Sequence, residues 1–276
     1  MSVVPPKPRG LLVGVIHLPA LPGSPGASRP LREIVAECVQ SARILAAEGY
    51  DVCMIENYGD VPFFRGAVPP VTTSAMTLCA AAARDAAPAL PLGVNVLRND
   101  ALTALAIAHV VGAVCVRVNV LTGARVTDQG VIEGAAAELL RARASLGAAG
   151  VAVWADVDVK HSSALAPQTL AQETSDLVVR ALADAVLVTG PGTGLAADAG
   201  KLREVALATR SSARPGVHVP VLVASGATVA SLPSLAEHAD GVIVGSALRA
   251  DGHAGGPIDA AAAATFAAAF RRAFPA

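Results

Sequence analysis

The segment "VWADVDVKHS" (residues 153–162) places two carboxylates and an ammonium group at alternate positions of a stretch that otherwise has the composition of a buried strand. Because side chains alternate between the faces of a strand, Asp156, Asp158 and Lys160 are expected on one face. Carboxylates near a lysine shift one another's pKa values, and such a set can supply an acid and a base. Asp156, Asp158 and Lys160 are therefore candidate catalytic residues.

Two alternatives concern the same segment. A Schiff base on Lys160 requires a depressed pKa, whereas the neighbouring carboxylates are expected to raise it, so an electrostatic or proton-donating role is preferred. Asp156 has an equally weighted structural interpretation as the partner of Arg117 in a buried salt bridge. His161 is expected to face outward by alternation, and we assign it to substrate binding.

The chain around this segment repeats one pattern, in which short Val-rich runs alternate with longer Ala- and Leu-rich runs. Such alternation is typical of βα units that form a parallel sheet. The eight expected strands are residues 11–18, 51–56, 91–97, 113–120, 151–159, 185–190, 220–226 and 241–246. We predict one α/β domain over residues 1–276, a (β/α)8 TIM barrel preceded by an extension at 1–10. An open doubly wound sheet is less favoured, because its Gly-rich loop normally follows the first strand.

Polar side chains stand at the last positions of most of these strands. Buried polar groups are costly unless they pair with one another or with a ligand, and barrel enzymes place catalytic groups at these strand ends. The further catalytic candidates are His17, Glu56 and Asn95. The further substrate-binding candidates are Asn57, Arg117 and Asn119.

Three glycine-containing turns follow the last three strands: "VTGPGTG" (188–194), "ASGA" (224–227) and "VGSAL" (244–248). Glycine lets backbone N–H groups approach an anion, and barrels frequently bind phosphate at these turns. The phosphate-binding candidates are Thr189, Gly190, Thr193, Gly194, Ser225, Gly226, Gly245 and Ser246. The alternative is that these glycines serve only to turn the chain.

A long loop at residues 121–134 follows the fourth strand, and its arms around "TDQG" predict a β-hairpin insertion. The C-terminal Phe266, Phe270 and Phe274 recur every fourth residue, which predicts a helix packed on the barrel and raises homo-oligomerisation as a hypothesis.

Composition narrows the class of protein. The 276 residues are 53% apolar with a formal net charge of -1, which favours a small-molecule protein and argues against nucleic-acid binding. The four cysteines have no metal-type spacing. No apolar run is long enough to predict a transmembrane segment or a signal peptide, so a cytoplasmic location is expected.

Eight short motifs occur in one order along almost the whole chain: "VGVIHLPALPGSP", "MIENYGDVPF", "GVNVLRND", "VRVNV", "TDQGVIEG", "ADVDVKHS", "VTGPGTG" and "VIVGSALR". In these motifs the chain resembles the BtpA/SgcQ family. The resemblance implies a TIM barrel similar to the ribulose-phosphate-binding barrels. It also implies a role either in photosystem I biogenesis, as a membrane-peripheral factor, or in sugar catabolism. The turn "ASGATVASL" departs from the family's expected "GSGVTxEN".

The preferred hypothesis is an enzyme that acts on a phosphorylated sugar or nucleotide-like molecule by isomerase, lyase or glycosyl-transfer chemistry. Glu56, Asp156 and Asp158 would offer oxygen ligands suited to Mg²⁺, which is the minority option for a cofactor. The alternative function is a non-catalytic assembly or stability factor of the photosystem I biogenesis type.

Overall fold

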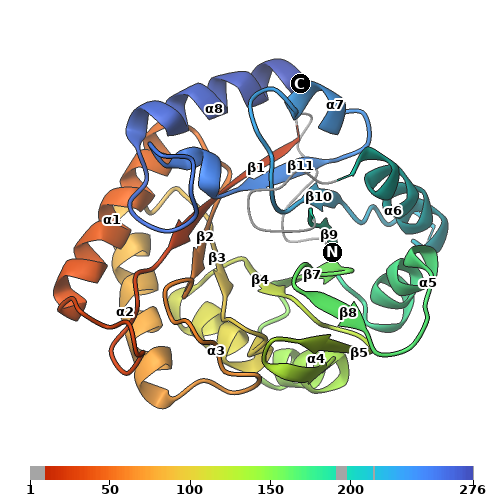
Figure 1. Cartoon of the computed structure of the whole chain (residues 1–276), viewed down its shortest axis with the longest axis horizontal. Coiled ribbons are helices and arrows are strands. Elements are labelled where there is room, and N and C mark those ends of the chain that lie inside the picture. Colours follow the sequence, from red (N-terminus) through yellow and green to blue (C-terminus); the bar gives the residue numbers. More distant parts are fainter. Residues whose placement is uncertain (1–9, 191–197, 214, 276) are drawn as a thin grey trace.

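The computed structural model describes residues 10–190, 198–213 and 215–275, and these form a closed barrel surrounded by helices (Figure 1). Eight parallel strands follow one another around the barrel in the order β1-β11-β10-β9-β7-β4-β3-β2 within this described part. The TIM-barrel prediction is therefore confirmed. Of the expected N-terminal extension, residues 1–9 lie outside the described residues.

Each barrel strand lies within a run expected from the sequence. The bounds are β1 Leu11–His17, β2 Val52–Glu56, β3 Leu92–Asn95, β4 Cys115–Val118, β7 Ala152–Val157, β9 Ala185–Val188, β10 Val221–Val223 and β11 Gly241–Val244. Apolar residues, with Val the commonest, make up most of these strands, as is typical of a parallel sheet that is covered on both faces.

Alternation along the strands divides the molecule into two cores. One face of each strand packs outward against the helices, and the other fills the barrel interior with side chains such as Val13, Met54, Trp154 and Leu187. The last inward position on each of β1 and β2 is polar, at His17 and Glu56. Polar groups therefore begin where the apolar interior ends, at the carboxyl ends of the strands.

The surrounding helices are α1 Leu31–Ala47, α2 Pro70–Ala86, α3 Ala101–Val111, α4 Ala136–Ser145, α5 Leu170–Ser175, α6 Ala199–Ser212, α7 Leu232–Leu235 and α8 Ala260–Ala273. A π-helical turn, Asp176–Arg180, follows α5, and a 3-10 turn, Ser246–Leu248, follows β11. Side chains of Asp100, Asp198 and Asp259 accept backbone N–H groups at the starts of α3, α6 and α8. These caps satisfy donors that the first helical turn leaves free.

A second, three-stranded sheet stands beside the carboxyl end of the barrel. β5 Ala124–Thr127 and β6 Gly130–Glu133 form an antiparallel hairpin at the position where the sequence predicts one. A third strand, β8 Ser162–Ala164, pairs with β5 and has no counterpart among the expected strands. It joins the hairpin to the chain that leaves β7.

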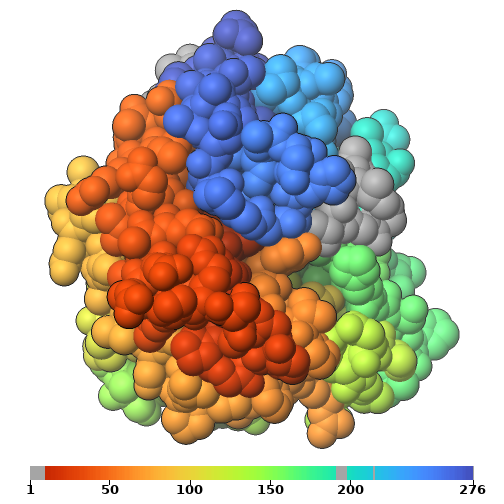
Figure 2. All heavy atoms as spheres, turned by 60° about the vertical axis from the view of Figure 1, so that its left-hand side comes forward, coloured from red at the N-terminus to blue at the C-terminus, as the bar shows by residue number. Residues whose placement is uncertain are grey.

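The first and last barrel strands pair to close the barrel. β1 pairs with β11, and Figure 2 shows the blue C-terminal residues lying directly against the red N-terminal ones. Phe266, Phe270 and Phe274 of the last unit are buried within this chain, so the stripe offers no exposed surface for a second copy. Among the described residues, no helix is both long enough and apolar enough to cross a membrane.

Candidate functional site

A cavity of about 230 Å³ lies at the carboxyl ends of the barrel strands, above the apolar interior. Its apolar lining comes from Val15, Val61, Phe63, Leu97, Ala224 and Ile243. Its remaining lining residues are His17, Glu56, Tyr58, Arg98, Arg117, Asn119, Lys160, His161, Ser225, Gly226, Gly245 and Ser246. Residues from the first to the last barrel strand therefore converge on one cavity, as in barrel enzymes.

The floor of the cavity is a buried ion pair. Arg117 Nε and Nη2 each donate to Asp156 at 3.0 Å, and Asn119 Nδ2 donates to Asp156 Oδ2 at 2.7 Å. Burial lowers the pKa of Arg117, but Asp156 and Glu56 outweigh it, so the pKa lies above its usual value. The geometry of Asp156 therefore agrees with its interpretation as the salt-bridge partner of Arg117. Both of its carboxylate oxygens accept hydrogen bonds, from Arg117 and Asn119.

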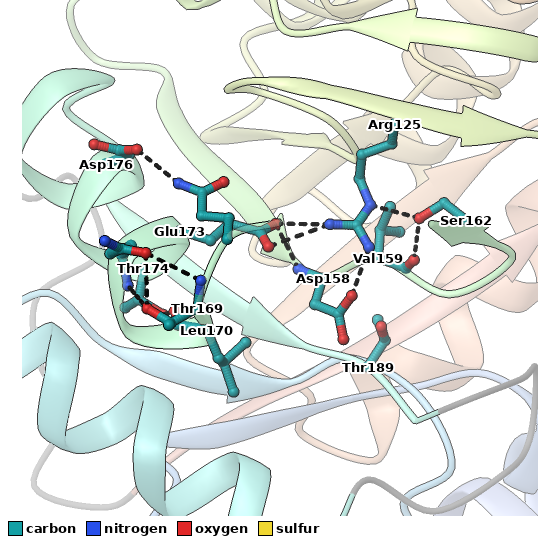
Figure 3. A network of polar contacts seen from close by, with 12 residues as sticks. Arg125, Asp158, Val159, Ser162, Thr169, Leu170, Glu173, Thr174, Asp176 and Thr189 are labelled. Atoms are coloured by element: carbon teal, nitrogen blue, oxygen red, sulfur yellow. Dashed lines mark hydrogen bonds and ion pairs between the residues drawn. The ribbon is translucent and has the colours of Figure 1, made fainter. Parts of the chain in front are cut away.

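Asp158 departs from the face that alternation predicts. β7 ends at Val157, and Asp158, with a φ of 45°, does not line the cavity; its side chain points toward Arg125 (Figure 3). Arg125 Nη2 donates to Asp158 Oδ1 at 2.5 Å, and Lys201 Nζ donates to Oδ2 at 2.8 Å. Although burial raises the pKa of Asp158, these two cations lower it below its usual value.

Arg125 holds this segment from the hairpin side. Its guanidinium also donates to both carboxylate oxygens of Glu173 on α5 at 3.2 Å and to Ser162 Oγ at 2.6 Å (Figure 3). Glu173 Oε1 in turn accepts the Asp158 N–H at 2.8 Å. The carboxylate of Asp158 therefore belongs to a network that fixes the chain after β7.

Lys160 returns to the cavity, where its Nζ lies 3.4 Å from Ser225 Oγ. It forms no ion pair with any residue that the structure describes. Burial, followed by the charge of Arg117, lowers its pKa to about 8. The expectation that this pKa is raised overall is wrong: Glu56 and Asp156 do raise it, but burial and the charge of Arg117 outweigh them, and Asp158 points toward Arg125 and Lys201. A Schiff base on Lys160 requires a depressed pKa, so the main argument against a nucleophilic role no longer holds.

His161 lines the cavity, although alternation predicts the outer face for it. Its φ of 57° interrupts the strand pattern. Burial and the nearby Lys160 lower its pKa below the usual value, which favours the neutral ring.

His17 and Glu56 lie at the ends of β1 and β2, across the barrel from β7. His17 Nε2 lies 3.9 Å from Glu56 Oε1, and Arg117 Nη1 lies 4.0 Å from Glu56 Oε2. The ring of Tyr58 stacks on His17 with centroids 4.4 Å apart. Glu56 is therefore a buried carboxylate with two long ionic contacts and an open side toward the cavity.

Two of the three glycine-containing turns line the cavity. Ser225, Gly226, Gly245 and Ser246 line the cavity beside Lys160. A Cβ at Gly245 would lie 2.8 Å from His17 Cε1, so this glycine makes room for the imidazole.

The remaining turn lies elsewhere. Thr189 Oγ1 accepts the Lys160 N–H at 3.3 Å, so this buried residue positions the lysine's backbone and does not line the cavity. Gly190 is buried next to it, outside the cavity lining. Thr193 and Gly194 lie outside the described residues.

Two asparagines lie behind the cavity wall. Asn57 exchanges hydrogen bonds with the backbone of Leu97, at 2.7 and 3.4 Å, and donates to Asp60. Asn95 Nδ2 donates to Arg117 O, and its buried Oδ1 has no hydrogen-bond partner among the described residues. Both candidates therefore shape the strand ends and do not contact the cavity.

The candidate set omits several residues that contribute to the site. Arg98 lines the cavity and donates to Lys160 O at 2.7 Å. Tyr58 and Phe63 form an aromatic edge. Arg98 and Tyr58 follow strands, in the motifs "GVNVLRND" and "MIENYGDVPF". This position after a barrel strand could have identified both as candidate site residues.

The carboxylates proposed for Mg²⁺ do not converge. Asp156 is bound by Arg117, and Asp158 points toward Arg125 and Lys201, which leaves Glu56 alone in the cavity. In the described part of the chain no group of three His, Cys, Asp or Glu residues is arranged to hold a metal ion.

The fold and the site define a (β/α)8 barrel with a cationic pocket at the carboxyl ends of its strands. The family model described as "BtpA family" matches residues 9–272, and the chain belongs to this family. It is 42% identical over 248 residues to the photosystem I biogenesis protein BtpA of Synechocystis, covering 90% of this chain and 83% of the relative. It is also 42% identical over 250 residues to an uncharacterised protein of Methanocaldococcus jannaschii, covering 90% of each.

Among solved structures, the chain is similar to 3-keto-L-gulonate-6-phosphate decarboxylase from Vibrio cholerae. The TM-score is 0.56 at 12% sequence identity, with 97% of this chain and 100% of the other covered. At this identity the similarity concerns the fold.

Proposed function

We propose that this protein is an enzyme that binds a phosphorylated small molecule, a sugar phosphate or nucleotide-like compound, in the cavity above the barrel. The observation that carries the proposal is Lys160. It is a partly buried ammonium group with no anionic partner in the described chain, and it lines the cavity together with the Ser225–Gly226 and Gly245–Ser246 turns. A partly buried cation of this kind loses part of its hydration, and an anion from outside compensates that loss.

The charge of the cavity supports an anionic ligand. Arg98, Arg117 and Lys160 contribute three cations to the lining, and Glu56 contributes the one carboxylate in the lining described. Arg117 is already paired with Asp156, so Arg98 and Lys160 remain for a ligand. Glycine turns let backbone N–H groups approach such a ligand, and ammonium groups bind phosphate as point charges.

Comparison with known proteins supports the same class. The barrel fold is shared with a decarboxylase whose name specifies a 6-phosphate substrate. The name of the Synechocystis relative, by contrast, describes a biogenesis factor, which motivates the alternative of a non-catalytic assembly role. A packed scaffold has no use for unpaired buried cations, so the cavity favours the enzyme.

Thermal shift measurements test the proposal. Wild-type protein is heated with inorganic phosphate, a series of sugar phosphates and nucleotides, and the matching unphosphorylated compounds, with and without Mg²⁺. A ligand that binds the folded state raises the melting temperature by mass action. We expect stabilisation by at least one phosphorylated compound and none by its unphosphorylated counterpart.

Two variants locate the binding. Ser246→Leu places a bulky side chain at the cavity and is expected to abolish the shift, as is Lys160→Met. Ser234→Leu on α7, an exposed serine outside the cavity lining, serves as the matched control. If no phosphorylated compound stabilises the wild type, the assembly-factor alternative replaces the proposal.

A further inference from the structure

The hydrogen-bonding state of His17 is fixed by the backbone. Its Nδ1 accepts the N–H of Gly255, which follows β11, at 3.0 Å. An amide nitrogen can only donate, so Nδ1 must present its lone pair, and the neutral ring carries its proton on Nε2. Nε2 is the nitrogen nearer Glu56, and His17 lines the cavity. The ring therefore presents an N–H donor to any ligand there.

Arg249 holds the loop that supplies this amide. Its Nε donates to Gly255 O at 3.1 Å, and its Nη1 donates to Gly245 O at 2.6 Å and to Val15 O at 3.0 Å. The residue is only 5% exposed. One buried side chain thus ties together β1, the end of β11 and the loop against His17, which makes Arg249 a positioning residue for the imidazole.

The surroundings keep the imidazole neutral. Burial, together with the charges of Arg249, Lys160 and Arg117, lowers the pKa of His17 well below its usual value. Two other groups face the imidazole. The carboxylate of Glu56 lies 3.9 Å from Nε2, and the uncharged ring of Tyr58 stacks on it. Protonation would also set an Nδ1–H against the N–H of Gly255, which removes a hydrogen bond.

A neutral imidazole N–H beside an available carboxylate suits one chemical step. Removal of a proton from a carbon next to a carbonyl moves negative charge onto the carbonyl oxygen, and a fixed donor in a dry site stabilises that charge. The carboxylate of Glu56 has no ionic partner closer than 3.9 Å among the described residues and is open to the cavity, so it is free to accept the proton.

We propose that the phosphorylated ligand also carries a carbonyl group, as an aldose or ketose phosphate does, that His17 Nε2 donates to the carbonyl oxygen, and that Glu56 removes a proton from the adjacent carbon. This proposal rests on the function proposed above and names the substrate class for the same site. The C–H electron pair forms a carbon–carbon double bond while the carbonyl π pair moves to oxygen. Return of the proton to carbon reverses the step, so no oxidant or second substrate is consumed.

The first test is independent of any ligand. Nitrogen-15 NMR of histidine-labelled protein, with His17→Gln to assign the signal, should show the Nε2–H tautomer unchanged from about pH 6 to about pH 8. Arg249→Met should convert this signal to a mixture of states. Arg84→Met, which removes another arginine donating to a backbone carbonyl, should leave it unchanged. A charged ring or an Nδ1–H tautomer in the wild type overturns the proposal.

The second test compares carbonyl compounds with their reduced alcohols. Dihydroxyacetone phosphate, ribulose phosphate and fructose phosphate are each paired with glycerol phosphate, ribitol phosphate or mannitol phosphate. In heavy water the wild type should catalyse deuterium incorporation next to the carbonyl of at least one compound. Glu56→Gln should lower that rate at least ~100-fold, since general base catalysis contributes about 10²–10⁴-fold. Equal melting temperatures of the variant and the wild type show that the fold is retained.

The outcomes separate the two proposals. If the phosphates bind but the carbonyl compounds bind no better than the alcohols and exchange no deuterium, the carbonyl inference is overturned and the phosphate-binding function stands. If only nucleotides of the thermal-shift series bind, the carbonyl inference is likewise overturned, and if no compound of that series binds, both proposals fall. Exchange that persists in Glu56→Gln assigns the base to another residue and contradicts the proposed role of Glu56.

Discussion

Two polar regions lie at the carboxyl end of the barrel, and they differ in how completely their charges are matched. In the network around Arg125, each charged group has an oppositely charged neighbour within 3.2 Å: Asp158, Glu173 and Lys201 complete it. In the cavity, Lys160 has no ion pair among the described residues, and Glu56 has ionic partners no closer than 3.9 Å.

This difference indicates different roles. A set of charges that satisfy one another stabilises a chain conformation, here the segment after β7, and needs nothing from outside. Charges left without close partners in a cavity raise the energy of the empty protein and favour a ligand that completes them. Asp158 and Lys160 are two residues apart in the sequence, and each belongs to a different region.

The largest expected effect on stability lies beneath both regions, at the cavity floor. Arg117→Met leaves Asp156 charged, buried and without its cation, and breaking such a pair costs about 3 to 5 kcal/mol. Urea unfolding should show this loss in the free energy of unfolding. The control is Arg29→Met, whose pair with Glu37 is partly exposed, with arginine and glutamate side chains 38% and 19% accessible, and which should cost under about 1 kcal/mol. Equal losses in both variants would contradict the described geometry.

A smaller loss is expected in the network. Arg125→Met removes hydrogen bonds to Asp158, Glu173 and Ser162, but water can reach the Asp158 side chain, which is 48% accessible. The expected loss in the free energy of unfolding is about 1 to 3 kcal/mol. Because Arg125 does not line the cavity, the pH dependence of any ligand binding should stay as in the wild type. A changed pH profile would show that the two regions are coupled.

Lys160→Met should have the opposite pattern, with little effect on stability and a large effect on binding. Replacing a partly buried cation that has no ion pair by an apolar side chain of similar length removes part of a desolvation cost. Calorimetric titration with the phosphorylated compound that stabilises the wild type should show at least a tenfold weaker affinity. Unchanged affinity would place the anion elsewhere.

A further expected effect is the pH dependence contributed by Lys160. Its pKa is about 8 in the folded protein and 10.5 when unperturbed. Between these values the unfolded chain holds a proton that the folded chain has lost, so this group makes stability rise with pH. The wild type should therefore gain more stability than Lys160→Met across this window in urea unfolding. Anion binding should weaken over the same range as the ammonium group loses its charge.

The sequence predicts the barrel well because all eight strands are Val-rich runs separated by long helical segments. Alternation also identifies inward polar residues at strand ends, among them His17, Glu56 and Arg117, because these positions keep regular strand geometry. The same rule fails for Asp158 and His161, where the φ angles of 45° and 57° break the period of two. No local signal in "ADVDVKHS" announces that break.

Partners distant in sequence are the other part that could not be predicted. Arg125 lies 33 residues before Asp158, and Arg249 lies 234 residues after Val15. Their roles depend on β8 pairing with the hairpin and on the closure of β11 against β1, neither of which periodicity specifies. The direction of the Lys160 pKa shift could not be predicted for the same reason, since it depends on how deeply the side chain is buried and on the approach of Arg117 from β4.

A crystal structure of the protein grown with a bound sugar phosphate, chosen as the compound with the largest thermal shift, tests the central claim most directly. We expect the phosphate within hydrogen-bonding distance of Lys160 Nζ and the Gly226 and Ser246 turns. Its remaining atoms should extend toward His17 and Glu56. A phosphate bound in the groove between the hairpin and α5, or an empty cavity at saturating ligand, would contradict the assignment of this cavity as the active site.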